Sequence, residues 1–97
     1  PTSRSVPWLA VRALRRSAFG LVVAGRIDSR ARGRVRLLLT DRRGTRVGRA
    51  VLRVRRGRFR GLVPLRAAAP RAAWLTLRYG GDRRHLPRSL RLSLPRR

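Results

Sequence analysis

The sequence contains no cysteine, lysine, glutamate, glutamine, asparagine or methionine. Without cysteine, neither a disulfide nor a thiolate metal site can stabilise the fold. Without lysine, the chain can form neither a P-loop nor a lysine Schiff base. No apolar run approaches the ~18 residues that a membrane-spanning helix needs. A hydrophobic core must therefore stabilise the fold, and 97 residues, 42% of them apolar, suffice for one small domain.

Negative charge is nearly absent as well. Asp28, Asp41 and Asp82 are the acidic residues, against 27 arginines, and the formal net charge is +24. Like charges at this density repel one another, so we expect stability to depend on salt and the surface to attract polyanions. Three carboxylates in this field predict neither a calcium site nor paired-carboxylate catalysis. A GC-rich coding sequence explains part of this composition. A non-coding GC-rich frame would share the composition, but it would not be expected to produce a regular alternation of apolar and polar residues between turns.

Apolar and polar side chains alternate in seven short stretches separated by turn residues, which predicts strands. We expect these strands near residues 8–14, 19–27, 35–40, 47–54, 59–63, 73–79 and 90–94. The predicted inward faces are Phe19, Leu21, Val23, Gly25 and Ile27; Val35, Leu37 and Leu39; Ala50, Leu52 and Val54; Phe59, Gly61 and Val63; Ala73, Leu75, Leu77 and Tyr79; and Leu90, Leu92 and Leu94. Seven strands at a spacing of ~8 to 14 residues are typical of an antiparallel β-sandwich.

Two stretches between these strands carry further predictions. Residues 15–17 close the first strand, and residues 66–72 form a crossing in which a short helical turn is possible despite Pro70. Trp74 falls opposite the inward face of its strand, so it either fills a second contact or lies exposed. Residues 1–7 are predicted to be a linker from a longer chain, residues 8–95 the sandwich domain, and residues 96–97 a tail.

A turn follows the sixth predicted strand. Tyr79, Gly80, Gly81 and Asp82 combine an inward ring, two residues that permit unusual backbone angles, and a side chain that can cap its own turn. The Tyr79 hydroxyl can tie a corner to nearby backbone. We therefore interpret these four residues as a structural turn.

The same region follows the pattern Tyr-x-Gly-Asp-x-x-aromatic-x-Pro, formed by Tyr79, Gly81, Asp82, His85 and Pro87. This resembles the end of bacterial immunoglobulin-like repeat domains, which occur in tandem in secreted and cell-surface proteins. His85 stands where that family usually has Tyr or Phe. The resemblance implies an Ig-like sandwich without a cofactor, a secreted or cell-surface location, and a spacer or adhesion role beside neighbouring domains of the same chain.

The resemblance extends over roughly residues 19–94, and the segment from Gly57 to Gly61 looks like the family's Gly-x-Phe strand start. Its most specific part is the final 15 residues or so.

Asp82, His85 and Ser89 could suggest a catalytic triad. All three fall within one loop and strand start, and no oxyanion-hole motif surrounds them. We expect instead a turn-forming aspartate and a partly exposed histidine, and we interpret the chain as not an enzyme.

Binding of nucleic acid or another polyanion by an arginine-rich domain is the alternative function. Arginine binds phosphate through two hydrogen bonds at once, with an affinity that falls steeply with salt. The arginines run evenly along the chain, so we expect nucleic acid to bind only non-specifically, and anionic surface polymers are possible partners. The densest cluster surrounds one predicted hairpin, and its residues are the candidate anion site: Arg53, Arg55, Arg56, Arg58 and Arg60.

Overall fold

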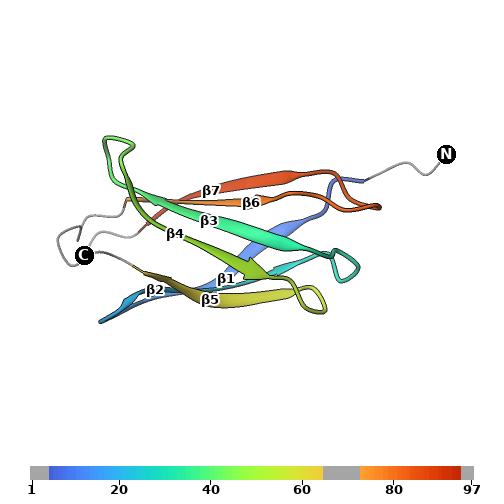
Figure 1. Ribbon diagram of the computed structural model, residues 1–97, viewed down its shortest axis with the longest axis horizontal. Coiled ribbons are helices and arrows are strands. Elements are labelled where there is room, and N and C mark those ends of the chain that lie inside the picture. The colour runs from blue at the N-terminus through green and yellow to red at the C-terminus, as the bar shows by residue number, and fades with distance from the viewer. Residues whose placement is uncertain (1–4, 65–72, 95–97) are drawn as a thin grey trace.

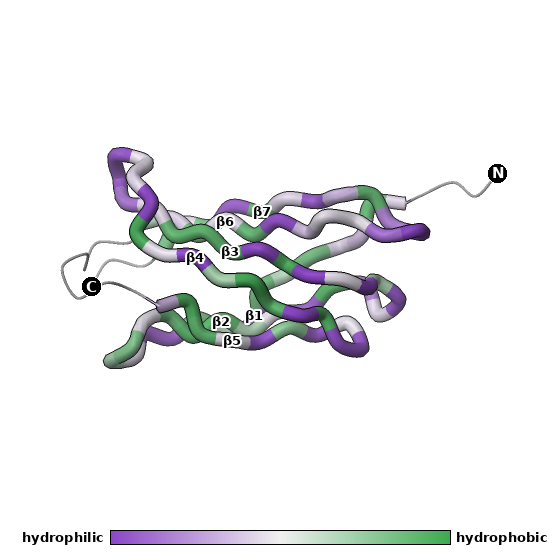
Figure 2. Tube along the Cα trace, in the orientation of Figure 1, coloured by the Kyte–Doolittle hydropathy of each residue, from purple (hydrophilic) through white to green (hydrophobic). Residues whose placement is uncertain are grey.

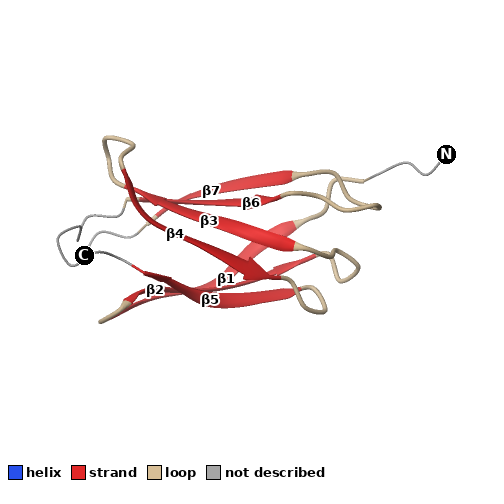
Figure 3. Ribbon diagram, viewed as in Figure 1, coloured by secondary structure: helices blue, strands red, loops and turns tan. Residues whose placement is uncertain are grey.

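The part of the chain that the structure describes folds into seven antiparallel β-strands arranged as two facing sheets (Figure 1). The computed structural model describes residues 5–64 and 73–94, and within them Figure 3 shows strands and loops only. The strands are β1 (Leu9–Ser17), β2 (Gly20–Ile27), β3 (Arg34–Thr40), β4 (Arg46–Arg53), β5 (Arg58–Pro64), β6 (Trp74–Tyr79) and β7 (Arg88–Ser93). One sheet has the order β1-β2-β5 and the other β4-β3-β6-β7. The prediction of an antiparallel seven-stranded sandwich is confirmed.

The core lies between the two sheets and follows the alternation of the sequence. Figure 2 shows hydrophobic and hydrophilic residues alternating along the strands. Every second residue of β3 is buried, and the same holds in the centre of β2 and β6, while in β5 Phe59 and Val63 are buried and Gly61 between them is half-buried. The buried apolar side chains are Leu9, Leu21, Val23, Ile27, Ala31, Val35, Leu37, Leu39, Leu52, Val54, Phe59, Val63, Leu75, Leu77 and Tyr79. These residues form one contiguous cluster.

The first hairpin differs from its prediction in two ways. Residues 15–17 do not close the first strand, because β1 runs on to Ser17 and pairs with β2 as far as Gly20. Phe19 does not face inward. It lies in the two-residue loop between Ser17 and Gly20 and is 78% exposed. A tight turn interrupts the alternation there, so an apolar residue at its tip has no sheet face to join.

β7 is an edge strand, and its inward leucines are only partly covered. Leu90, Leu92 and Leu94 are half-buried and pack against the margin of the core. Trp74, on the outer face of β6, is half-buried beneath Arg91, whose guanidinium carbon lies 4.2 Å from the ring centroid. Edge position therefore explains the weaker burial, since β7 has a neighbouring strand on one side only. The predicted crossing at residues 66–72 lies outside the described residues.

Gly25 illustrates how closely the strands of the smaller sheet approach. It pairs with Phe59 of β5 and with Val11 of β1. A Cβ atom placed on Gly25 would overlap the Phe59 ring and would lie 2.6 Å from the Ala10 carbonyl oxygen. The site has no room for a side chain.

Gly25→Ala is therefore expected to destabilise the protein by about 1–3 kcal/mol, because overpacking forces neighbouring groups to move. Gly80→Ala is the matched control, since nothing lies within 4 Å of its Cβ position; it should change stability by less than about 0.5 kcal/mol. Urea unfolding followed by tryptophan fluorescence measures both. Equal midpoints for the two variants would refute the close approach at Gly25.

Candidate functional site

Three loops meet at one end of the sandwich. They join β2 to β3, β4 to β5 and β6 to β7, and they lie together at the right in Figure 1. The chain reaches β1 from this end, because Ser5 donates its N–H to the Arg84 carbonyl oxygen at 3.1 Å and accepts from the Leu86 N–H at 2.8 Å. Charged and titratable side chains gather here, so this end is the candidate site.

The Asp82 carboxylate is the centre of a hydrogen-bond network between two of these loops. Its Oδ1 accepts the backbone N–H groups of Arg84 and His85, each at 2.7 Å. Its Oδ2 accepts the backbone N–H of Arg32 and the hydroxyl of Tyr79, each at 2.8 Å. One carboxylate therefore organises its own turn and fastens it to a segment 50 positions earlier.

The Tyr79 side chain joins the same network from the core side. Its ring is buried in the core, and its hydroxyl lies between the Asp82 carboxylate and the backbone of Arg32. The hydroxyl oxygen also accepts the Arg32 N–H at 3.2 Å. The Tyr79 hydroxyl has one proton and can donate it in a hydrogen bond either to the Arg32 carbonyl oxygen or to the Asp82 carboxylate. Either bond ties a loop to Tyr79 at the end of β6: the first ties the β2–β3 loop, and the second the β6–β7 loop.

His85 is buried, not partly exposed as the sequence suggested: 3% of its surface is accessible. Its Nδ1 lies 2.9 Å from Asp82 Oδ1, and its Nε2 lies 3.3 Å from Asp28 Oδ2. Both ring nitrogens face carboxylate oxygens, and both can donate only when the imidazole carries two protons. The contact with Asp28 brings the β2–β3 loop onto the ring and explains its burial.

The residues of the possible triad take other roles. Asp82 contacts the His85 ring at Nδ1, but the opposite nitrogen, where a nucleophile would have to lie, faces Asp28. Ser89 is exposed on β7. Asp41 lies at the far end of the sandwich, where its carboxylate caps the β3–β4 turn. Among residues 5–64 and 73–94, no group of three or more His, Asp or Glu side chains is arranged to hold a metal ion.

The network shifts the pKa of two of its groups in opposite directions. Burial tends to raise the pKa of Asp82, but hydrogen bonds from the Arg32 N–H, the Tyr79 hydroxyl, the Arg84 N–H and His85 outweigh it. The pKa of Asp82 therefore lies well below that of an ordinary aspartate. Burial, and then the hydrogen bond and charge of Asp82, raise the pKa of Tyr79 far above its usual value. Both shifts favour an ionised Asp82 beside a neutral Tyr79.

These shifts predict how stability depends on pH. A carboxylate whose pKa is depressed by folding stabilises the folded state above the unfolded pKa of about 3.9, and this contribution is lost as pH falls through the folded value. We therefore expect the stability that Asp82 provides to be complete at neutral pH and to decline below about pH 4. Asp82→Asn cannot titrate, so the gap in unfolding free energy between the natural chain and this variant should narrow on acidification. Urea titrations from neutral to strongly acidic pH measure this gap. A gap independent of pH would contradict the role of the ionised carboxylate.

The five arginines of the predicted anion site separate into two groups. Arg53, Arg55 and Arg56 line a cleft at the loop end, together with arginines from other loops. Arg58 and Arg60 are exposed on β5, where Arg58 pairs across the strands with Arg26. The predicted hairpin is instead a loop between the two sheets, because β4 and β5 belong to different sheets, and only Arg55 and Arg58 form an isolated bridge across it.

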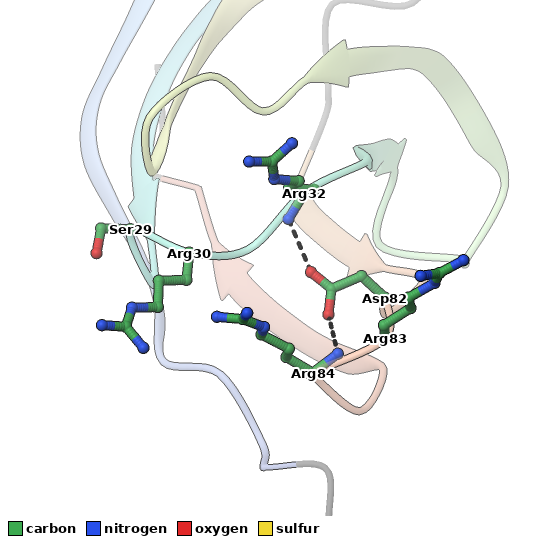
Figure 4. A pocket seen from close by; sticks show the side chains of 6 residues that line it. All are labelled: Ser29, Arg30, Arg32, Asp82, Arg83 and Arg84. Carbon is green, nitrogen blue, oxygen red and sulfur yellow. Dashed lines mark hydrogen bonds between the residues drawn. The ribbon is translucent and has the colours of Figure 1, made fainter. Parts of the chain in front are cut away.

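Two adjoining clefts occupy the loop end. The first is shown in Figure 4; its lining residues are Ser29, Arg30, Arg32, Asp82, Arg83 and Arg84. The second is lined by Ser29, Ala31, Arg32, Gly33, Arg34, Arg53, Val54, Arg55 and Arg56. The arginines at positions 30, 32, 34, 83 and 84 were missed by sequence reasoning. The order of the predicted strands could have identified these arginines, because every second loop of an antiparallel sandwich lies at the same end, which places the β2–β3, β4–β5 and β6–β7 loops together.

The chain matches no protein-family model, no curated protein and no solved structure. The resemblance to bacterial immunoglobulin-like repeats therefore rests on the residues that carry it. Within the part of the chain that the structure describes, no helix is long and apolar enough to cross a membrane.

Proposed function

We propose that this domain is a non-catalytic, Ig-like structural or adhesion module of a larger extracytoplasmic bacterial protein. The observation that carries the proposal is the path of the chain. Ser5 enters beside the β6–β7 loop, whereas Leu94 leaves at the opposite end, where its N–H bonds the Ala73 carbonyl oxygen at 2.8 Å. Entry and exit at opposite ends suit a module that separates its neighbours along a line (Figure 1).

The hydrogen bonds at the entry support the same proposal. Ser5 bonds to the loop that Asp82 organises, so the incoming chain is attached to the corner that the hydrogen bonds of Asp82 hold together. A pull on the incoming chain acts on the backbone on both sides of His85 and, through Asp82 and Tyr79, on β6. This arrangement suits a domain that must stay folded between other domains.

Two observations on the intact parent protein test the proposal. Its full sequence is expected to contain an export signal and neighbouring folded domains. On intact cells, an added protease is expected to cleave between those domains and release this one as a resistant fragment. A parent protein that is protected in intact cells and becomes accessible only after lysis would overturn the proposal.

A further inference from the structure

The loop end carries eight arginines around its two clefts, although arginines are spread evenly along the sequence. Those arginines come from three loops and the strands beside them: Arg30, Arg32, Arg34, Arg53, Arg55, Arg56, Arg83 and Arg84. Ser29 and Arg32 line both clefts, so the two form one continuous concave surface. All eight arginines are exposed and accessible to a ligand.

This positive charge is balanced only in part by the described residues. The carboxylate of Asp82 lines the first cleft, with its oxygens hydrogen-bonded to Tyr79, His85 and backbone N–H groups, and the carboxylate of Asp28 lies beside Arg30 and His85. Two carboxylates therefore accompany eight arginines. Within residues 5–64 and 73–94, none of the eight arginines forms an ion pair with a carboxylate. Arg34 and Arg53 also pair directly across β3 and β4, where like charges are unfavourable. A bound anion would relieve this repulsion.

The backbone that presents these arginines is held in place before any ligand binds. The N–H groups of Arg32 and Arg84 bond to the two oxygens of the same carboxylate, while their guanidinium groups point away from it (Figure 4). The Asp82 network thus fixes the distance between two arginine-bearing loops. Preorganisation of this kind lowers the entropy that binding must overcome.

We propose that the two clefts form a binding site for a linear polyanion that carries phosphate or sulfate groups on successive units. Each guanidinium can donate two parallel hydrogen bonds to one such group. Among the described residues no aromatic side chain lines either cleft, so they offer no surface on which bases could stack. This favours a polymer without bases, such as polyphosphate or a sulfated polysaccharide, over single-stranded nucleic acid. The proposal is independent of the spacer function.

The test uses two triple variants that remove equal charge from opposite ends of the sandwich. The first is Arg32→Ser, Arg55→Ser and Arg84→Ser in the clefts. The second, the control, is Arg42→Ser, Arg43→Ser and Arg46→Ser in and beside the β3–β4 loop, where all three side chains are exposed. Binding is measured by titration calorimetry with inorganic polyphosphate, a sulfated oligosaccharide and single-stranded DNA, each with the same number of charges. Circular dichroism first establishes that each variant is folded.

We expect the cleft variant to bind polyphosphate, the sulfated oligosaccharide or both at least about tenfold more weakly than the control variant. The slope of log affinity against log salt concentration should also be smaller in magnitude by about two for the cleft variant than for the natural chain, since three arginine–anion contacts are lost. Comparison of the affinities for polyphosphate and for the sulfated oligosaccharide shows whether phosphate or sulfate groups are preferred. Equal losses for the two variants would mean that total charge alone matters and would overturn the site. Tighter binding of DNA than of both other polymers would overturn the proposed ligand class.

A variant that keeps the net charge tests the site independently, in case the serine variant does not fold. Arg32→Lys, Arg55→Lys and Arg84→Lys keep the net charge but lose the bidentate fork. Affinity for the preferred polymer is expected to fall about threefold or more, whereas the same lysine changes at positions 42, 43 and 46 should have no effect. Undiminished binding by the lysine variant of the clefts would contradict bidentate recognition.

Discussion

Asp82→Ala is expected to lower the free energy of unfolding by about 3–5 kcal/mol, a large share of the stability of a domain of this size. The change removes the acceptor for three backbone N–H groups and one hydroxyl, and it leaves the buried His85 ring without one of its two carboxylates. The bonds from the Tyr79 hydroxyl and the His85 N–H are part-buried and the His85 ring is buried, so these donors incur a desolvation penalty when they lose their partner, whereas the bonds from Arg32 and Arg84 are exposed. The loop that Asp82 fastens should also detach from Arg32.

Asp41→Ala provides the matched control for this prediction. Its carboxylate also accepts two backbone N–H groups, from Arg43 and Thr45, but these bonds stay within one exposed turn. Its loss should cost about 1 kcal/mol. Differential scanning calorimetry should find a melting temperature lower by about 12 °C or more for Asp82→Ala, and by less than about 8 °C for the control. Similar shifts for the two variants would show that Asp82 is an ordinary turn residue.

Leu77→Ala is expected to destabilise the fold by about 2–5 kcal/mol, because it leaves a cavity in the centre of the core. Leu77 is fully buried on β6, between Leu37 of β3 and Leu90 of β7. Strands on both sides restrict how far the surroundings can collapse, so we expect a value in the upper part of this range.

Leu92→Ala is the control, since it removes the same atoms from a half-buried position on the edge strand. It should cost about 1–2 kcal/mol. Urea unfolding of the two variants should therefore give clearly separated midpoints. Coincident midpoints would show that β7 is as deeply enclosed as β6, against the observed burial.

The strands could be predicted because each one has one face in the core and one in solvent. In β3, the apolar residues Val35, Leu37 and Leu39 are buried, Arg34 and Arg36 are exposed, and Leu38 is half-buried. Because the side-chain period of a strand is 2, such a pattern fits one structure and excludes a helix. Glycine and aspartate then marked several of the turns that separate the strands.

The alternation predicted the ends of strands and the burial of edge strands less well. Phe19 continues the alternation of β2 in the sequence but lies at the tip of a hairpin, because hydrophobicity alone does not say where a strand turns back. The leucines of β7 alternate as regularly as those of β6, yet they are half-buried. Whether a strand lies in the centre or at the edge of a sheet depends on its neighbours, which the strand's own sequence does not identify.

The candidate site could be predicted only in its local part. Tyr79 and Asp82 were recognised as a corner because their bonds lie largely within one turn. The burial of His85 depends on Asp28, and the anchoring of Asp82 depends on Arg32, both from a loop about 50 residues earlier. The arginine clefts likewise combine three loops. Such contacts follow from the topology of the two sheets and not from any local pattern.

The pairing of β3, β6 and β7 is tested most directly by nuclear Overhauser contacts in the isotope-labelled protein. Leu77 is expected to show backbone contacts to Leu37 on one side and to Leu90 on the other, as the strand register requires. Contacts between Leu77 and residues three or four positions away, as in a helix, or the absence of any contact to Leu37 and Leu90, would contradict the sandwich.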